Sequence, residues 1–594
     1  MPSGERPQVM ALCAEKHLVW IAVALALLLA GCGTAERAMQ NPAGMNAPGD
    51  ERRSDAMKWG QTVRSVRVET VCEQTDVVAA IIRVLKRQIE DRCEAEVQTA
   101  GEGELTVRLA IRPGIGDEGF RIADGADGAI DVIGNDARGL LYGVGKFLRT
   151  SRADRGGFSP GLWRGTSAPE KRVRGIYFAT HFHNFYHDAP IEKVERYVED
   201  LGLWGFNTLC VWYDMHHFNG FEDPEAAEFR ERLRRILRAA KGIGMGVGFG
   251  VVANEGYGNS PKPLRADPAG MRGAKMESDI CPSVPGGKEY VLGNFAEYFS
   301  AFADLAPETV WIWPYDSGGC GCKNCQPWGQ DHFLKMAEPV AQLARREFEG
   351  ARIILSTWFF TEEEYRGLVE AFREKPDWVD YILAEHFVDA GTDLPTRLGV
   401  PGGLPMVGFP EISMWGMLPW GGYGANPRPA ALQAEWRERG GGLDGGFPYS
   451  EGIYEDINKA LFAQFYWQAD KPAEETLKEY VAFEFGPDVV EDALTAIRLL
   501  EENHPRDRIG ESACRAWDLM KKSDAKLTPQ ARRSWRWRIL YLRASIDKEM
   551  YERKGKLRGE TLRQAFRELT GIYHADNALE DWLRPPEVEA AGPR

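Results

Sequence analysis

The chain has 594 residues, of which 44% are hydrophobic and 18 are Trp, and its formal net charge is -15. This apolar content excludes an intrinsically disordered chain, and the length predicts more than one hydrophobic core and therefore several domains. A surface for nucleic acid needs a clustered basic face, so the acidic balance predicts that nucleic acid is not a partner.

The first residues predict an export signal. Basic residues precede an apolar run over 19–30, which is too short to span a membrane and fits the apolar part of a signal peptide. The run ends in Leu-Ala-Gly-Cys32, which resembles the bacterial lipobox, and this resemblance implies cleavage before Cys32 and lipidation of that residue. We therefore expect a signal peptide over 1–31, a flexible tether over 32–60 and a lipid anchor to a bacterial membrane, in the periplasm or at the cell surface. An ordinary signal peptide with an incidental cysteine is the alternative.

Residues 61–165 predict a small α/β domain. The segment 135–149 begins with an Asn or Asp cap and has one apolar face, which is typical of a helix. By the same reading of periodicity, strands are expected over 63–70, 104–111, 119–123 and 129–134, and a further helix over 76–91.

Residues 166–470 alternate strand-like and helix-like segments eight times, which predicts a (β/α)8 TIM barrel. The eight strands are expected over 173–180, 208–213, 246–253, 309–315, 352–358, 381–384, 405–409 and 445–449. Residues 471–590 have helical periodicity, and we expect a helical C-terminal domain there.

Four of these apolar runs close with an acid at the start of a loop, at Asp316, Glu385, Glu411 and Glu451. A carboxylate at the end of a buried strand is out of place unless it faces a cleft, and barrel enzymes carry their sites at the carboxyl ends of their strands. The four acids are therefore the candidate catalytic residues. A structural role is the alternative for each one, and Glu451 lies where an acid would also satisfy a helix dipole.

Aromatic and polar residues gather at the same strand ends. Aromatic faces stack on sugars and polar groups bind their hydroxyls, while two carboxyls cleave the glycosidic bond. The candidate substrate-binding residues are His181, His183, Trp212, Tyr213, Asp214, Asn254, Tyr315, Trp358, Trp415 and Tyr449. No catalytic metal and no cofactor is expected. A metal-dependent barrel hydrolase built on the histidines and Asp214 is an alternative.

Cys320, Cys322 and Cys325 follow Asp316 in a glycine-rich loop. Such a loop needs a brace to hold a catalytic acid, because glycine adds backbone freedom that folding must remove. We expect at least two of these thiols, with Cys281 as a further partner, to lie within bonding distance beside the pocket. Disulfides and a structural metal are both open.

The segment 135–149 resembles the end of the domain that precedes the barrel in β-hexosaminidases (glycoside hydrolase family 20) and α-glucuronidases (family 67). The whole chain resembles the glycoside hydrolase group that contains families 20, 67, 84 and 163. Families 20 and 84 have two adjacent acids after strand four, whereas Asp316 is followed here by Ser317. Family 67 has one acid on strand four and two carboxylates on later strands, which Asp316, Glu385 and Glu411 match in kind and order.

The resemblance and the strand-end acids predict an exported, lipid-anchored glycoside hydrolase of polysaccharide or glycan fragments, α-glucuronidase-like or N-acetylhexosaminidase-like. Asp316 is expected as the general acid, Glu385 or Glu411 as base or nucleophile, and Glu451 as the reserve candidate. The alternative is a non-catalytic, surface glycan-binding lipoprotein that keeps the barrel as a platform. The enzyme requires at least two of the four carboxyls to converge at one pocket.

Overall fold

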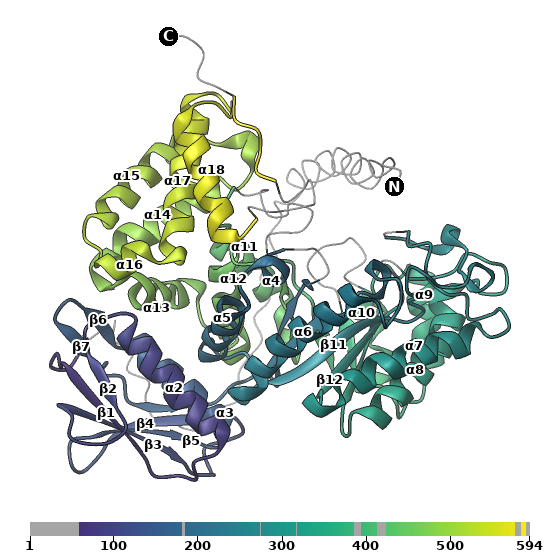
Figure 1. Cartoon of the computed structure of the whole chain (residues 1–594), viewed down its shortest axis with the longest axis horizontal. Coiled ribbons are helices and arrows are strands. Elements are labelled where there is room, and N and C mark those ends of the chain that lie inside the picture. The colour runs from purple at the N-terminus through teal and green to yellow at the C-terminus, as the bar shows by residue number, and fades with distance from the viewer. Residues whose placement is uncertain are drawn as a thin grey trace, which may run out of the picture. The chain divides into compact units, whose positions relative to one another are not determined.

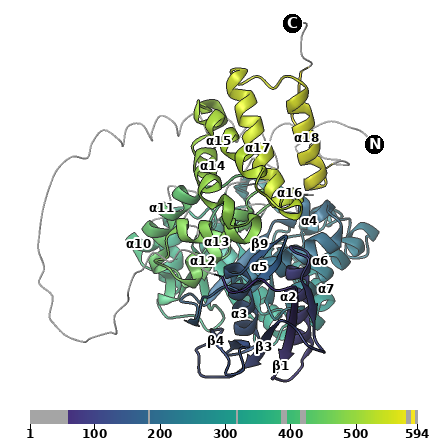
Figure 2. The same cartoon turned by 90° about the vertical axis from the view of Figure 1, so that its left-hand side faces the viewer.

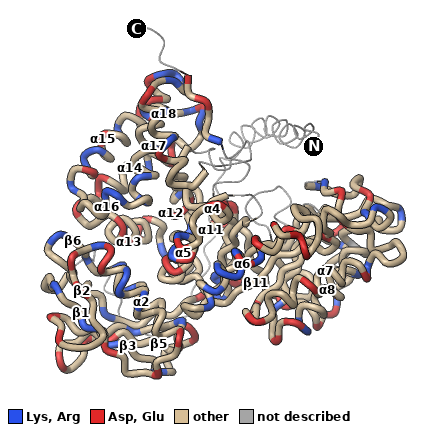
Figure 3. The backbone as a smooth tube through the Cα atoms, in the orientation of Figure 1, with Lys and Arg blue, Asp and Glu red and all other residues tan. Residues whose placement is uncertain are grey.

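A computed structural model of the chain is shown in Figure 1, and the two termini are marked there. It describes residues 59–180, 184–273, 275–315, 318–384, 394–412, 423–575 and 584–589. Within these ranges, no helix is both long enough and apolar enough to cross a membrane. Lys and Arg are interspersed with Asp and Glu along the described chain (Figure 3).

A six-stranded sheet forms the first part of the fold, with helices α2 (Asp76–Glu90) and α3 (Ala137–Thr150) packed against it (Figure 1). Helix α3 begins as expected, because the Asp136 side chain caps it by accepting a hydrogen bond from the Gly139 backbone N–H. The strands, in the spatial order β2-β1-β3-β5-β4-β8, are β1 (Ser65–Thr70), β2 (Glu96–Gln98), β3 (Leu105–Ile111), β4 (Phe120–Asp124), β5 (Ile130–Gly134) and β8 (Gly165–Ser167). A hairpin of β6 (Arg152–Asp154) and β7 (Gly157–Ser159) precedes β8.

Eight parallel strands then close into a barrel, so the predicted TIM barrel is confirmed. The ring closes because β9 pairs with β10 on one side and with β16 and β17, two short pieces of the eighth strand, on the other. The strands are β9 (Val173–Phe178), β10 (Thr208–Trp212), β11 (Gly246–Val252), β12 (Thr309–Trp313), β13 (Arg352–Ser356), β14 (Tyr381–Ala384), β15 (Met406–Gly408), β16 (Gly445–Gly446) and β17 (Tyr449–Ser450).

Helices follow the strands around the ring. Helix α9 illustrates why they begin where they do: the Thr361 side chain accepts from the Glu364 N–H, and the Glu364 carboxylate accepts from the Thr361 N–H. The helices are α4 (Phe185–Asp188) and α5 (Ile191–Trp204) after β9, α6 (Pro224–Gly242) after β10, α7 (Gly287–Phe302) after β11, α8 (Phe333–Glu347) after β12, α9 (Glu362–Ala371) after β13, α10 (Leu394–Leu398) after β14, α11 (Pro429–Arg439) after β15 and α12 (Asp456–Trp467) after β17.

Large aromatic side chains fill the barrel. Trp311 and Trp313 have ring centroids 5.2 Å apart, and Tyr177, Phe409 and Phe447 belong to the same buried cluster. Glycines on neighbouring strands make the space, since a Cβ at position 250 would lie 1.7 Å from Trp311 Nε1. The interior is therefore a packed core, which leaves the strand ends for chemistry.

The C-terminal part is helical, as expected, and Figure 2 shows its helices in green and yellow. Buried ion pairs fix it to the rest of the chain: Glu479 accepts from Arg149 Nε at 2.7 Å, and Asp456 accepts from Arg536 Nε at 2.8 Å. The helices are α13 (Ala473–Phe485), α14 (Val490–Glu502), α15 (Ser512–Asp524), α16 (Pro529–Arg533), α17 (Trp535–Glu552) and α18 (Glu560–Tyr573).

Candidate active site

Two of the four predicted acids, Glu411 and Glu451, lie together at the carboxyl ends of strands seven and eight. The Tyr449 N–H donates to the Pro410 carbonyl at 2.9 Å, and Glu411 and Tyr449 form a parallel bridge. The Tyr449 hydroxyl donates to Glu451 Oε1 at 2.6 Å. The structure thus brings two carboxyls and one tyrosine to a single edge of the barrel.

The Glu451 carboxyl is in a setting that favours its protonated form. Glu451 is only 1% exposed, and this burial raises the pKa of its carboxyl well above the usual value. The nearby charge of Glu411 raises the pKa further. Glu451 Oε2 accepts no hydrogen bond from any residue that the structure describes. A buried carboxyl that keeps its proton beside an acid is the arrangement from which a general acid works.

The backbone at Glu451 is clamped by a residue that the sequence did not indicate. Glu455 Oε1 accepts from the Glu451 N–H at 3.0 Å, from the Gly452 N–H at 3.0 Å and from Ser450 Oγ at 2.8 Å. The Tyr573 hydroxyl, at the end of α18, donates to the Glu451 carbonyl at 2.6 Å. Helix α18 therefore takes part in fixing an acid at the barrel mouth.

Lys459 completes this support from α12. Its Nζ lies 3.4 Å from Glu455 Oε1 and donates to the Tyr197 hydroxyl at 2.8 Å and the Tyr186 hydroxyl at 3.2 Å. Lys459 is 0% exposed, and this burial lowers its pKa. The only clue in the sequence was the spacing of an acid and a lysine four residues apart on a helix, which is common on surfaces too.

A second cluster of titratable groups lies at the ends of strands two and three. His216 Nδ1 is 2.7 Å from Asp214 Oδ1, and His216 Nε2 is 2.6 Å from Asp279 Oδ1. Burial alone would lower the pKa of His216, but the carboxylates of Asp279 and Asp214 raise it well above its usual value. Both ring nitrogens are occupied by carboxylates, so this His acts as a buried cation, which does not favour the metal-dependent alternative.

Glu255 borders the same cluster and has a strongly shifted pKa. Its Oε2 accepts from Trp212 Nε1 at 3.1 Å and its Oε1 from the Met215 N–H at 2.7 Å. Burial raises the pKa of Glu255 to about 8. With three acids around one imidazolium, Glu255 is the acid that holds a proton at neutral pH.

This pKa predicts a pH dependence of stability. Between the ordinary value of 4.5 and about 8, folded Glu255 keeps a proton that the unfolded chain has released. Unfolding then releases a proton, so the free energy of unfolding should fall as pH rises, by up to about 1.4 kcal/mol per pH unit. The free energy of unfolding is measured with urea at several pH values from 5 to 8. For Glu255→Gln it should fall less steeply with pH than for the wild type, because this proton is not released. Glu289→Gln, an exposed change on α7, is the control, and an equal slope in both variants would contradict the assignment.

Several predicted substrate-binding residues form contacts within the protein. Tyr213 points away from the barrel interior toward α6 and α7, where its hydroxyl accepts from Arg230 at 3.1 Å and its ring lies 5.0 Å from that of Tyr298. The Asn254 amide is buried and joins two loops, donating to the carbonyls of Ile280 at 2.9 Å and Gly319 at 3.0 Å. The Tyr213 contacts fix the end of strand two to two helices, and the Asn254 contacts fix the end of strand three to two loops.

Tyr315 and Asp214 are likewise engaged within the protein. The Tyr315 hydroxyl donates to Glu364, and the Arg272 guanidinium lies 4.1 Å from the centre of the Tyr315 ring. Asp214 is buried against His216. The Tyr315 contacts fix the end of strand four to Glu364 and Arg272. The contact of Asp214 stays within its own loop, and His216 joins that loop to Asp279.

Two predicted aromatic residues lie at the mouth itself. Trp358 and Tyr449 are partly buried and pack against the aromatic core of the barrel. Trp212 lies deeper, with its ring 5.5 Å from that of Trp313. Partly exposed rings over an aromatic core form a surface on which a sugar ring can stack.

The remaining predicted residues lie outside the described ranges, and their roles stay predictions. They are His181, His183, Asp316, Glu385, Trp415 and Cys32.

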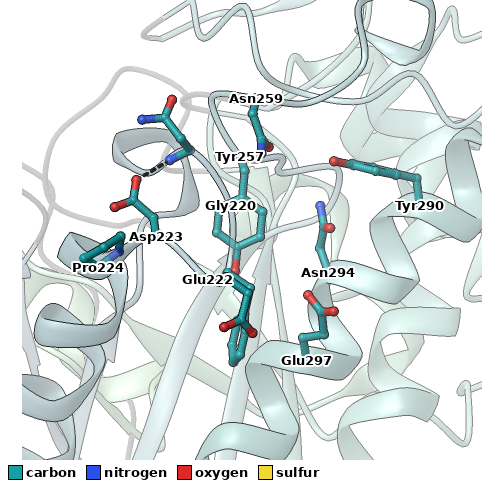
Figure 4. A pocket seen from close by; sticks show the side chains of 11 residues that line it. Gly220, Glu222, Asp223, Pro224, Tyr257, Asn259, Tyr290, Asn294 and Glu297 are labelled. Atoms are coloured by element: carbon teal, nitrogen blue, oxygen red, sulfur yellow. Dashed lines mark hydrogen bonds between the residues drawn. The ribbon is translucent and has the colours of Figure 1, made fainter.

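A separate pocket of about 740 Å³ lies on the loops after β10 and β11, beside α6 and α7. Figure 4 shows the residues that line it, among them Asp223, Tyr257, Tyr290, Asn294 and Glu297. None of its lining residues belongs to the two acid clusters. The catalytic candidates therefore lie at the strand ends and not in this pocket.

Comparisons with known proteins agree with the fold. The sequence matches no family model and no curated protein. One similar solved structure is a family GH115 4-O-methyl-α-glucuronidase with specificity for decorated arabinogalactans. It is 12% identical in sequence, with a TM-score of 0.56, and the alignment covers 90% of this chain and 81% of the GH115 chain. A GH138 enzyme targeting pectin rhamnogalacturonan II is 13% identical with a TM-score of 0.54, covering 86% and 72%. The chain therefore shares the fold of glycoside hydrolases, as the resemblance implied.

Proposed function

We propose that the chain is an exported, lipid-anchored glycoside hydrolase that acts on polysaccharide or glycan fragments. The observation that carries this proposal is the convergence of Glu411 and Glu451 at the carboxyl ends of neighbouring barrel strands. Paired carboxyls at this edge of a barrel are the machinery of glycosidic bond cleavage. The lipobox-like sequence at Cys32 supports the export and the anchor.

In this proposal Glu451 is the general acid. Its proton moves to the glycosidic oxygen as the bond from that oxygen to the anomeric carbon breaks, and the freed alcohol leaves. The Glu411 carboxylate either removes a proton from the water that attacks the anomeric carbon, or attacks that carbon itself to form a glycosyl ester. In the second case, water activated by the deprotonated Glu451 then hydrolyses the ester, which frees Glu411 and returns the proton to Glu451. Asp316 and Glu385, predicted for the same mouth, are the further carboxylates that would contact the substrate.

The substrate class is proposed from two lines of support. Trp358 and Tyr449 offer ring faces at the mouth, which suit the apolar face of a pyranose. The first structural neighbour is described as a 4-O-methyl-α-glucuronidase with specificity for decorated arabinogalactans, and the second as targeting pectin rhamnogalacturonan II. Uronic-acid-bearing glycans are therefore the first substrates to test. N-acetylhexosamine glycans are the second.

The test is a hydrolysis screen with the purified protein. Aryl α-glucuronides, aryl N-acetylhexosaminides and uronic-acid oligosaccharides are incubated with the wild type, with Glu411→Gln and with Asp444→Asn. Asp444 lies just before β16, at the opposite end of the eighth strand, and is the matched control. We expect sugar release by the wild type and by Asp444→Asn, and its loss in Glu411→Gln. Glycan binding without release from any substrate would instead support the non-catalytic glycan-binding protein.

A further inference from the structure

We propose that Cys281, Cys320, Cys322 and Cys325 bind one structural zinc ion. The four Sγ atoms all lie within 4.8 Å of one another, although they come from two separate segments of the chain. Cys281 belongs to the long insertion after β11, and the other three cysteines belong to the loop after β12. This inference does not depend on the proposed activity.

The distances between the sulfur atoms fit a shared ion better than disulfides. Cys281 Sγ lies 3.7 Å from Cys322 Sγ and 3.6 Å from Cys325 Sγ. Zinc–thiolate bonds of about 2.3 Å in a tetrahedron set sulfur atoms about 3.8 Å apart, whereas a disulfide needs about 2.05 Å. All eight cysteines that the structure describes are free. Cys281 Sγ is about equally close to two other sulfur atoms, which fits four thiolates around one ion better than a single disulfide.

The backbone around the cluster prepares the thiols to act as ligands. The Asp267 N–H points to Cys320 Sγ at 3.4 Å, and Ser283 Oγ lies 3.0 Å from Cys325 Sγ. The Cys325 N–H donates to the Cys322 carbonyl at 2.9 Å, which forms the tight turn of a C-x-x-C pair. This spacing is the usual one for two ligands of a structural zinc site.

The site is closed. Cys281 is 2% exposed, and Cys320 and Cys325 are 0% exposed, while Cys322 is partly exposed. Four protein ligands leave no position for water or substrate, which separates a structural zinc site from a catalytic one. The ion would therefore stabilise the fold and take no direct part in a reaction.

The site would fix two walls of the barrel mouth to each other. The Cys281 N–H donates to the Leu264 carbonyl at 2.7 Å, and the Gly321 N–H donates to the Asp267 carbonyl at 2.8 Å, so both cysteine segments pack on the same insertion. The loop with Cys320 begins at the end of β12, where Asp316 is predicted to act. Hydrogen bonds such as those of Gly319 with Asn254 already hold part of this glycine-rich loop. A metal ion would add a brace that joins the loop to the insertion with Cys281.

The first experiment measures metal content. The wild type, Cys320→Ser and Cys514→Ser are each purified without chelator. Their metal content is measured by inductively coupled plasma mass spectrometry. Cys514 lies on α15, far along the chain from the cluster, and is the matched control. We expect one zinc per chain in the wild type and in Cys514→Ser, and a loss of most zinc in Cys320→Ser. Full zinc occupancy in Cys320→Ser would overturn the proposal, and iron in place of zinc would overturn the choice of metal.

A second measurement covers the case in which Cys320→Ser fails to fold. Zinc in the wild type is exchanged for cobalt, whose visible and near-ultraviolet bands report tetrahedral thiolate ligation. We expect strong sulfur-to-cobalt charge-transfer bands and titration to one equivalent. Their absence, or an intact mass that rises on reduction because disulfides open, would overturn the site. Removal of the zinc should also lower the thermal midpoint of unfolding, since an ion bound only by the folded state stabilises it.

Discussion

Glu451→Gln is expected to reduce turnover of the natural substrate by about 10²–10⁴-fold, the range that a general acid contributes. In the wild type the Tyr449 hydroxyl donates a hydrogen bond to Glu451 at 2.6 Å. Gln has a similar shape and can accept the same bond, but it cannot donate a proton to the leaving group. Binding of substrate should therefore change little while kcat falls. Because burial and Glu411 raise the pKa of Glu451, the active protonated form is lost as pH rises, so wild-type kcat should decline on the alkaline side.

The leaving group of the substrate distinguishes a general acid from a base or nucleophile at position 451. A dinitrophenyl glycoside needs no protonation to depart, so Glu451→Gln should lose far less activity on it than on an alkyl glycoside. Asp444→Asn, at the other end of the same strand, should behave as wild type on both. An equal loss on both glycosides would make Glu451 the base or nucleophile. A variant with full activity on both would return the acid role to Asp316.

The barrel was predictable because its strands are buried on both sides and read as continuous apolar runs. The eighth strand departs from its expected range of 445–449 and splits into β16 and β17. Pro448 lies at the break and lacks the N–H that a continuous ladder needs, although its carbonyl still accepts from the Tyr177 N–H at 3.1 Å. The hydrophobic pattern therefore predicts where the strand lies, and the missing N–H of Pro448 explains why it is interrupted.

The catalytic candidates were predictable in part. Glu411 and Glu451 stood out because an acid closes an apolar run, and this signal is local in the sequence. Tyr213 was predicted at the mouth but points outward, because adjacent residues at a strand end face opposite sides and Trp212 already points inward.

The supporting partners were not predictable, because they lie far apart in the chain. Asp279 meets His216 across 63 positions, and Tyr573 meets Glu451 across 122. Nothing local in the sequence distinguishes these residues from ordinary surface positions. Only the closed barrel and the docked helix α18 bring them to the strand ends.

Lys459→Met is expected to destabilise the fold by about 3–5 kcal/mol, the cost of removing one partner of a buried ion pair. Lys459 and Glu455 are both 0% exposed, so the variant leaves the Glu455 carboxylate buried without its cation, although it keeps the N–H groups of Glu451 and Gly452. Urea unfolding followed by circular dichroism at pH 7 measures the change.

The exposed pair of Lys478 and Glu474 provides a matched control, because it has the same four-residue spacing, with Nζ and Oε1 3.1 Å apart and side chains 44% and 50% exposed. Lys478→Met should cost less than about 1 kcal/mol. Adding Glu455→Gln to Lys459→Met should recover part of the lost stability, since a neutral amide needs no buried cation. If the double variant is no more stable than Lys459→Met, the loss arises from the other contacts of Lys459, which are with the Tyr186 and Tyr197 hydroxyls and the Gly452 carbonyl. The charge of Glu455 is then not what Lys459 balances. Glu455 also holds the backbone of Glu451, so Lys459→Met should disturb the position of that acid. If kcat falls by more than the fraction of unfolded protein explains, the buried pair of Lys459 and Glu455 also positions the active site.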